Sequence, residues 1–249
     1  MAKRPAQTPA EQADAPGSSS RTLIERAYRQ LREDILGGKL VPGQKLRVEH
    51  LKADYTVGAG TLREALARLV SDALVVAEGQ RGFTVAPMTV DELEDLTNLR
   101  VFIETAAIQE AIRSSNPAWR QQLTTAFASL SALEQPLLST HFSAWESANF
   151  WFHECLLQGG ASPWTIRILR QLTAHGERYR RLAIRVPGLR RNVHEEHQQI
   201  FDSAMAGQPA RAALALEAHV RMTPDLLIKA LREGQISLSE SPTRTPHSP

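Results

Sequence analysis

The chain has 249 residues, and its 29 Lys and Arg against 27 Asp and Glu give a formal net charge of only +2. This length suits one or two domains with a sizeable core, and so small a charge does not by itself indicate nucleic-acid binding. No stretch approaches the roughly 18 consecutive apolar residues of a membrane span. The single cysteine, Cys155, excludes an intrachain disulfide framework and fits a reducing compartment. We therefore expect a cytoplasmic protein with no membrane partner.

The first part of the chain divides into a polar arm and two helices. Residues 1–20 are rich in Pro, Ala, Ser and Gln and lack the apolar core of a signal peptide, so we expect a disordered arm. Residues 21–36 show helical periodicity that Gly37-Gly38 ends, and residues 48–55 predict a second, shorter helix.

The most informative stretch follows, with the sequence VGAGTLREALARLVSDALVVAEGQRGFTV. It begins with a glycine-rich turn at residues 57–60, followed by an amphipathic helix at 61–71 that carries Arg63 and Arg68. Two short apolar runs, at 74–77 and 83–86, then lie on either side of a basic tip at 78–82. A helix able to enter a major groove, followed by such a hairpin, is typical of a winged helix-turn-helix over residues 21–86. The alternative is an ordinary helix packed on a hairpin.

These residues resemble the N-terminal domain of the GntR family of bacterial transcription regulators. The resemblance rests on the GGKLVPGQKL turn, the LREAL helix and the RGFTV wing taken together, and it implies binding to a double-stranded DNA operator. Many members carry Ser-Arg-Thr, with a base-reading arginine, where this chain has Gly58-Ala59-Gly60. The glycine-rich turn lets main-chain amides approach phosphates instead. The expected DNA contacts are Gly60, Thr61, Arg63, Arg68, Arg81 and Gly82.

After a linker over residues 87–89, the sequence is helical throughout and shows no strand-like alternation. Proline and glycine divide it into six predicted helices, at 90–114, 117–134, 139–158, 162–185, 189–206 and 208–232. We expect an all-α bundle over residues 90–232 and a disordered Ser/Thr/Pro-rich tail over residues 233–249. The fold class is thus mainly α, in two domains.

Three histidines interrupt apolar helix faces of this bundle. His153 follows Asn149 by one helical turn, and His197 and His219 lie among apolar residues of two later helices. Each alone is more simply explained as a hydrogen-bonded core residue, but several buried imidazoles need a shared partner. A divalent metal ion, with zinc the expected one, supplies it. His194 is expected to be an outer or surface group.

Residues 89–232 resemble the helical effector-binding domain of the FadR branch of the same family, the FCD domain, and the chain is most similar to the carbon-starvation-induced regulator branch. Many members hold a metal through an acidic residue, a histidine four residues later and two further histidines. His153, His197 and His219 match these histidines, whereas Asn149 stands where aspartate is usual. The resemblance implies a small carboxylate effector that meets the metal.

Candidate effector-binding residues are arginines. Arg100 stands where family members can carry an effector-binding arginine, and a guanidinium binds a carboxylate bidentately. An ion pair with Glu104 on a solvated face explains Arg100 equally well. Arg178 and Arg181 are weaker candidates from a basic cluster. Because Asn149 brings no charge, three imidazoles and an amide leave the metal open to an anion. Alternatively, Asn149 only forms hydrogen bonds and the ion is absent.

Two functions compete on these grounds. The first is a ligand-responsive transcription regulator, expected to repress a catabolic operon as a homodimer on a palindromic site. The second is a metal-dependent hydrolase or isomerase, which needs a general base beside the metal. Glu154 and Glu196 are neighbours of the histidines in sequence but are expected to point away. The regulator is therefore preferred, and no enzyme activity is expected.

Overall fold

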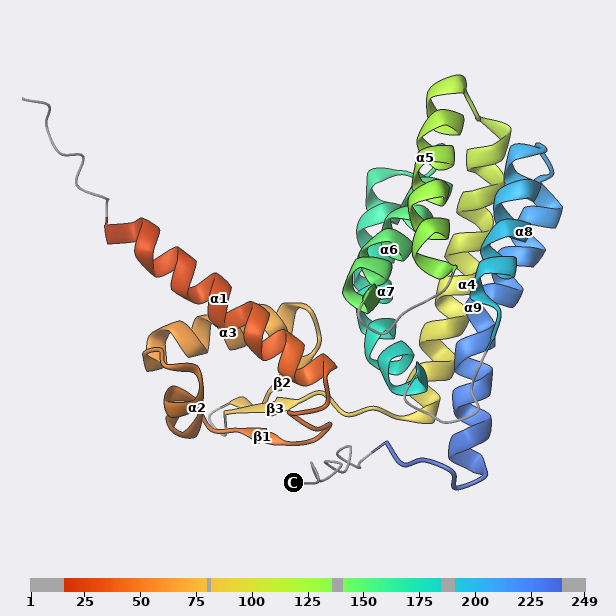
Figure 1. Ribbon diagram of the computed structural model, residues 1–249. Coiled ribbons are helices and arrows are strands. Elements are labelled where there is room, and N and C mark those ends of the chain that lie inside the picture. The colour runs from red at the N-terminus through yellow and green to blue at the C-terminus, as the bar shows by residue number, and fades with distance from the viewer. Residues whose placement is uncertain (1–15, 80–81, 136–140, 185–190, 239–249) are drawn as a thin grey trace, which may run out of the picture. The chain divides into compact units, whose positions relative to one another are not determined.

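The computed structural model describes residues 16–79, 82–135, 141–184 and 191–238, which are mainly helical (Figure 1). The chain divides into two units, one comprising the residues up to Ile35 together with Gly43–Ala86, and the other comprising Leu36–Pro42 and the residues from Pro87 onward. The first unit ends at Ala86, and the second resumes at Pro87.

The first unit begins with helix α1 (Pro16–Leu36), followed by strand β1 (Lys45–Leu46) and helices α2 (Val48–Tyr55) and α3 (Ala59–Ser71). α1 starts at Pro16, so the last residues of the expected disordered arm are helical. The apolar faces of the three helices form the core, which contains Ile24, Ala27, Leu31, Leu51, Tyr55, Leu62, Leu66 and Leu69. Tyr55 also donates a hydrogen bond to Asp34 of α1, and Tyr28 donates one to Asp72.

The wing is a three-stranded antiparallel sheet, not the two-stranded hairpin that the sequence predicts. β2 (Val75–Ala77) and β3 (Phe83–Val85) pair as expected, and β1 adds to the other edge of β3, with Lys45 opposite Thr84. At the hairpin tip the Glu78 amide donates to the Gly82 carbonyl at 2.9 Å. Gly82 has φ of 99°, a conformation that favours glycine.

The second unit is a bundle of six helices in the described part of the chain. They are α4 (Val90–Arg113), α5 (Pro117–Glu134), α6 (Phe142–Gln158), α7 (Pro163–Ile184), α8 (Val193–Met205) and α9 (Pro209–Arg232). α4 and α9, the first and last of them, run side by side along the bundle (Figure 1). The predicted helices agree with these bounds to within a few residues where both ends are described. None of the helices described is long and apolar enough to cross a membrane.

Side-chain caps explain several helix starts. Thr89 accepts a hydrogen bond from the Glu92 amide, and Asn116 and Asn192 accept bonds from the third residue of α5 and α8. The cap at Asn192 places the start of α8 at Val193, later than the predicted start at 189. Beyond α9, the Gln235 amide donates to Ala230, and Ile236 packs on the bundle. The first residues of the expected disordered tail are therefore part of the fold.

Gly159 and Gly160, at the end of α6, mark a close approach between helices. A Cβ atom on Gly160 would lie 2.6 Å from the carbonyl carbon of Glu110 in α4, and one on Gly159 would lie 2.9 Å from the Trp119 ring. Trp119 donates from its indole nitrogen to the Cys155 carbonyl at 2.9 Å. The two glycines thus let the end of α6 lie against α4 and α5.

Candidate functional sites

The N-terminus of α3 is exposed and carries two of the expected DNA contacts. Gly58 is its N-cap and provides no side-chain cap, so the first amides of the helix are not satisfied by a capping side chain. Gly60 lies in the first helical turn and not in the preceding turn, because α3 begins at Ala59. Thr61 is half-buried beside it. The arrangement leaves amide donors at the surface, which suits an anion such as phosphate.

The two arginines of α3 differ in their surroundings. Arg63 is exposed, and in the described part of the chain no ion pair holds it. Arg68 donates to Glu25 of α1 at 3.1 Å and lies 3.7 Å from Glu64. Arg68 therefore links α3 to α1, whereas Arg63 is available to a partner.

Of the two expected wing contacts, Gly82 is explained by its positive φ at the hairpin tip, which favours glycine whether or not DNA is bound. Arg81 lies outside the described residues. Two further basic residues are exposed in this unit, Lys45 in β1 and Arg47 at the N-cap of α2, and neither is predicted from the sequence as a DNA contact. Only the buried Leu46 separates them along the chain, because β1 runs directly into α2. Two isolated cations outside a recognisable motif give little signal in a sequence.

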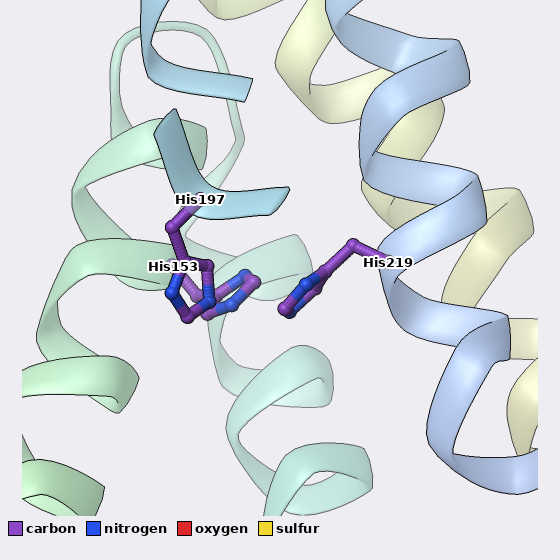
Figure 2. Close-up of side chains that lie close together, drawn as sticks. All are labelled: His153, His197 and His219. Carbon is purple, nitrogen blue, oxygen red and sulfur yellow. The ribbon is translucent and has the colours of Figure 1, made fainter. Parts of the chain in front are cut away.

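In the second unit, His153, His197 and His219 converge from α6, α8 and α9. One ring nitrogen of each lies within 4.8 Å of the others, and Figure 2 shows the three rings pointing toward one another. His197 is fully buried and packs edge-on against Phe152. The helical periodicity of three separate segments thus brings together the three histidines that the sequence predicts as one site.

Two nitrogens of this cluster have no hydrogen-bond partner among the described residues. They are Nδ1 of His153 and Nε2 of His197, and both are buried. An unpaired buried polar atom costs free energy comparable to a lost hydrogen bond. Three imidazoles in reach of one point are a donor set that zinc and related divalent ions prefer. The residues present therefore fit a divalent metal ion.

Glu134, at the end of α5, sets the orientation of His197. Its Oε1 lies 2.8 Å from Nδ1 of His197 and accepts the Trp145 indole at 3.0 Å, while Oε2 lies 3.2 Å from Nδ1 of His194. Burial alone raises the pKa of Glu134, but hydrogen bonds from His197, Trp145 and His194 lower it below its ordinary value. With Nδ1 of His197 donating to this carboxylate, the lone pair of Nε2 faces the other two rings.

His219 has a carboxylate partner as well. Oε2 of Glu196 lies 2.9 Å from its Nδ1, so the expectation that Glu196 points away is wrong. Arg191 forms an ion pair with Glu196, donates to Thr223, and lies 3.0 Å from the same Nδ1. α8 carries Glu196 beside His197 in sequence, but the carboxylate extends to the histidine of α9. Two of the three imidazoles thus have an outer carboxylate.

Burial keeps the imidazoles of His153 and His219 neutral. Desolvation lowers the pKa of His153 and of His219 well below 6.5, and the neighbouring histidines and the guanidiniums of Arg100 and Arg180 lower both further. A neutral imidazole is the form that binds a metal ion.

A cavity of about 70 Å³ lies beside the histidines. Its polar lining includes Asn149, His153 and His219 together with three arginines, Arg100, Arg180 and Arg191. Arg100 donates to Glu104 at 2.7 Å, and this pair is buried, with side-chain exposures of 13% and 2%. Arg100 therefore forms the expected ion pair, in the interior and not on a solvated face, and it also lines the cavity.

The other two predicted effector arginines are engaged elsewhere. Arg178 donates to the main-chain oxygen of Pro87 at 3.0 Å, and Arg181 binds Glu146 and Glu177 at 2.8 and 2.9 Å. Neither lines the cavity beside the histidines. Arg180, which lies between them in the sequence, does. The sequence alone does not show which face of α7 meets the cavity, because the partners of Arg178, Arg180 and Arg181 lie on distant parts of the chain.

Comparisons with known proteins cover nearly all of the described chain. The FCD domain matches residues 95–222, and the bacterial regulatory proteins of the gntR family match residues 23–85. The HTH-type transcriptional regulator BphR of Paraburkholderia xenovorans is 38% identical over 214 residues, covering 85% of this chain and 87% of that protein. The HTH-type transcriptional repressor GlaR of Escherichia coli is 30% identical over 212 residues, covering 83% and 96%.

Solved structures show the same fold. McbR/YncC of E. coli superposes with a TM-score of 0.65 at 18% identity, covering 84% of this chain and 98% of that one. A GntR transcriptional regulator from Rhodococcus also gives 0.65, at 20% identity and 84% and 99% coverage. The matched family and the relatives BphR and GlaR are transcription regulators and not enzymes, so the hydrolase or isomerase alternative is set aside. This chain belongs to the GntR family of DNA-binding transcription regulators and carries an FCD domain.

Proposed function

We propose that this regulator is a repressor whose DNA binding responds to a small carboxylate held at a metal ion in the FCD domain. The observation that carries the proposal is the convergence of three histidines, two of which have a buried nitrogen with no partner among the described residues. His153 and His219 of this cluster line a cavity that three arginines also line. The name of the relative GlaR, a repressor, supports repression as the direction of control.

The ion, proposed to be zinc, is held by His153, His197 and His219, with the Asn149 side chain as a neutral oxygen donor from the same cavity lining. When bound, the ion supplies a positive centre that attracts an anion. Asn149 contributes no negative charge to balance the ion. Glu134 and Glu196 supply negative charge from behind the imidazoles of His197 and His219. The arginines then favour an anionic ligand in the remaining space.

DNA binding is proposed to occur through α3 and the wing of two copies of the chain. The exposed Arg63 reads a base edge, and the amides at the start of α3 meet a phosphate. One small module covers few base pairs, so a homodimer on a palindromic operator multiplies the discrimination. The protein acts in the cytoplasm, where its operator lies. A ligand shifts such binding only by its differential affinity for two states, about 1–3 kcal/mol.

The test uses purified full-length protein and a DNA fragment from upstream of its own gene. We expect bound zinc by elemental analysis, a sedimentation coefficient of a dimer, and a gel shift that small carboxylates weaken. His197→Ala should lose the metal and the carboxylate response, whereas Glu195→Gln, an exposed neighbour on α8, should keep both. Metal-free wild-type protein, or a carboxylate response that His197→Ala retains, contradicts the metal-linked mechanism.

A further inference from the structure

Arg180 of α7 is a buried cation with incomplete partners. Its Nε is buried and has no hydrogen-bond partner among the described residues, and the side chain lines the cavity beside His153 and His219. A desolvated guanidinium with an unsatisfied donor is costly unless an anion completes it. The nearby acids Glu146 and Glu177 attract Arg180, but both are bound to Arg181. An anion inside the cavity is a better partner.

Arg100 and Arg180 approach the same point. A Cβ atom on Gly176, a helical glycine that lines the cavity, would lie 3.5 Å from Nη1 of Arg100 and 3.7 Å from Nη1 of Arg180. Burial lowers the pKa of Arg180, and the like charge of Arg100 lowers it further. Two cations held over one glycine repel each other, and a bound anion between them would remove that repulsion.

The guanidiniums also offer more donors than one carboxylate can use together with the metal. The Nε of Arg100 donates to Glu104, whereas its Nη1 lies near Gly176. One carboxylate satisfies one guanidinium fork bidentately, and a carboxylate that meets the ion has an oxygen already engaged. The cavity therefore contains donors for a second anionic group.

We propose that Arg100 and Arg180 form a subsite for a second carboxylate, so that the ligand of this cavity is a small dicarboxylate. One carboxylate meets the ion at the histidines, and the other lies between the two guanidiniums above Gly176. This inference rests on the proposed carboxylate response. The cavity volume of about 70 Å³ restricts the ligand to a short chain.

The experiment compares succinate with butyrate, which has the same number of carbons and one carboxylate, by calorimetry on zinc-loaded full-length protein. We expect wild type to bind succinate at least tenfold more tightly. Arg180→Met should bind succinate no better than butyrate, whereas Arg167→Gln, at another arginine of α7 that stacks on Trp164, should keep the preference. Equal affinities in wild type, or an Arg180→Met protein with the wild-type preference, overturn the dicarboxylate subsite while butyrate binding still supports carboxylate sensing. If neither acid binds, both proposals fail.

A purely structural role for Arg180 predicts a different result. If Arg180 serves only to pair with Glu146 and Glu177, the ligand-free Arg180→Met protein should melt at a lower temperature than wild type. If it serves the ligand, the ligand-free variant should melt at the same or a higher temperature, because an unsatisfied buried charge has been removed. Arg180→Lys keeps the charge without the fork and should lose several-fold of the succinate preference. An unchanged preference in Arg180→Lys would contradict recognition by the guanidinium.

Discussion

At the residue scale, the exposed Arg63 and the paired Arg68 make a matched pair of variants on one helix. Arg63→Ala should weaken operator binding by about 1–3 kcal/mol and relax specificity at one position, because a bidentate base contact is lost. Arg68→Ala should change affinity less than tenfold, since its partner is Glu25 and an exposed ion pair contributes little. Gel shifts at fixed salt measure both. Equal losses in the two variants would show that Arg68 also contacts DNA.

Glu134 gives a prediction about the metal. Glu134→Gln should lower zinc affinity by about 10- to 100-fold, because the carboxylate that fixes the His197 tautomer and orientation is replaced by an amide. Competition with a fluorescent chelator measures the affinity. Glu195→Gln, which changes an exposed acid near the site, should leave it unchanged. A Glu134→Gln protein with wild-type affinity would mean that the fold alone orients the ring.

Asn149 allows a separate test of charge. Asn149→Asp should retain metal more tightly yet respond less to an anionic ligand, because the added negative charge neutralises the ion and repels the carboxylate. Chelator competition and ligand titration on the same sample compare the two effects. An Asn149→Asp protein that holds metal less tightly than wild type and responds more to an anionic ligand would show that Asn149 is not a ligand.

Sequence reasoning finds residues whose local pattern is unusual and misses those whose role depends on distant partners. His153, His197 and His219 stand out because an imidazole on an apolar face needs an explanation. Glu134 does not stand out, because it lies 63 residues from the histidine that it orients. Arg180 looks like its neighbours in a basic cluster, and only the path of α7 shows that it faces the cavity.

At the scale of the elements, Gly159 and Gly160 after α6 allow close packing against α4 and α5. Gly160→Ala should destabilise the bundle by about 1–3 kcal/mol, because its methyl group would meet the main chain of α4 at 2.6 Å. Gly60→Ala, where the same atom meets nothing within 4 Å, should leave the melting temperature unchanged or raise it slightly. Calorimetry of both variants checks this. A Gly160→Ala protein as stable as wild type would mean that the helices can move apart without cost.

Periodicity predicts long helices well and short strands poorly. The helices of the bundle could be predicted because an apolar stripe recurs over four or more turns. β1 has only two residues, too few for any alternation, and becomes a strand because β3 lies beside it. The early start of α3 at Ala59 escaped prediction because glycines on both sides are typical of a turn.

For the whole molecule, the buried histidines predict a loss of stability in acid. The folded protein resists protonation of His153 and His219, whose pKa values lie well below 6.5, whereas the unfolded chain takes up protons as the pH falls through that value. The free energy of unfolding of the metal-free protein should therefore fall below pH 6.5, by at most about 1.4 kcal/mol per pH unit for each histidine.

Urea denaturation with a chelator at pH 7.5, 6.5 and 5.5 checks this prediction. His219→Gln should flatten the dependence, and His141→Gln, which removes an exposed imidazole, should not. A pH profile that is the same in His219→Gln as in wild type would assign the acid sensitivity to other groups.

The pairing of α4 with α9 has a consequence for how the protein is made. The first helix of the bundle packs along the last one as well as against α6 and α7, so part of its apolar face stays uncovered until the end of the domain has left the ribosome. His219, the last of the three histidines, arrives with that same helix. During synthesis the nascent domain is thus exposed to chaperones and proteases until α9 has emerged, and a chain that stops before α9 can neither close its core nor bring the three histidines together.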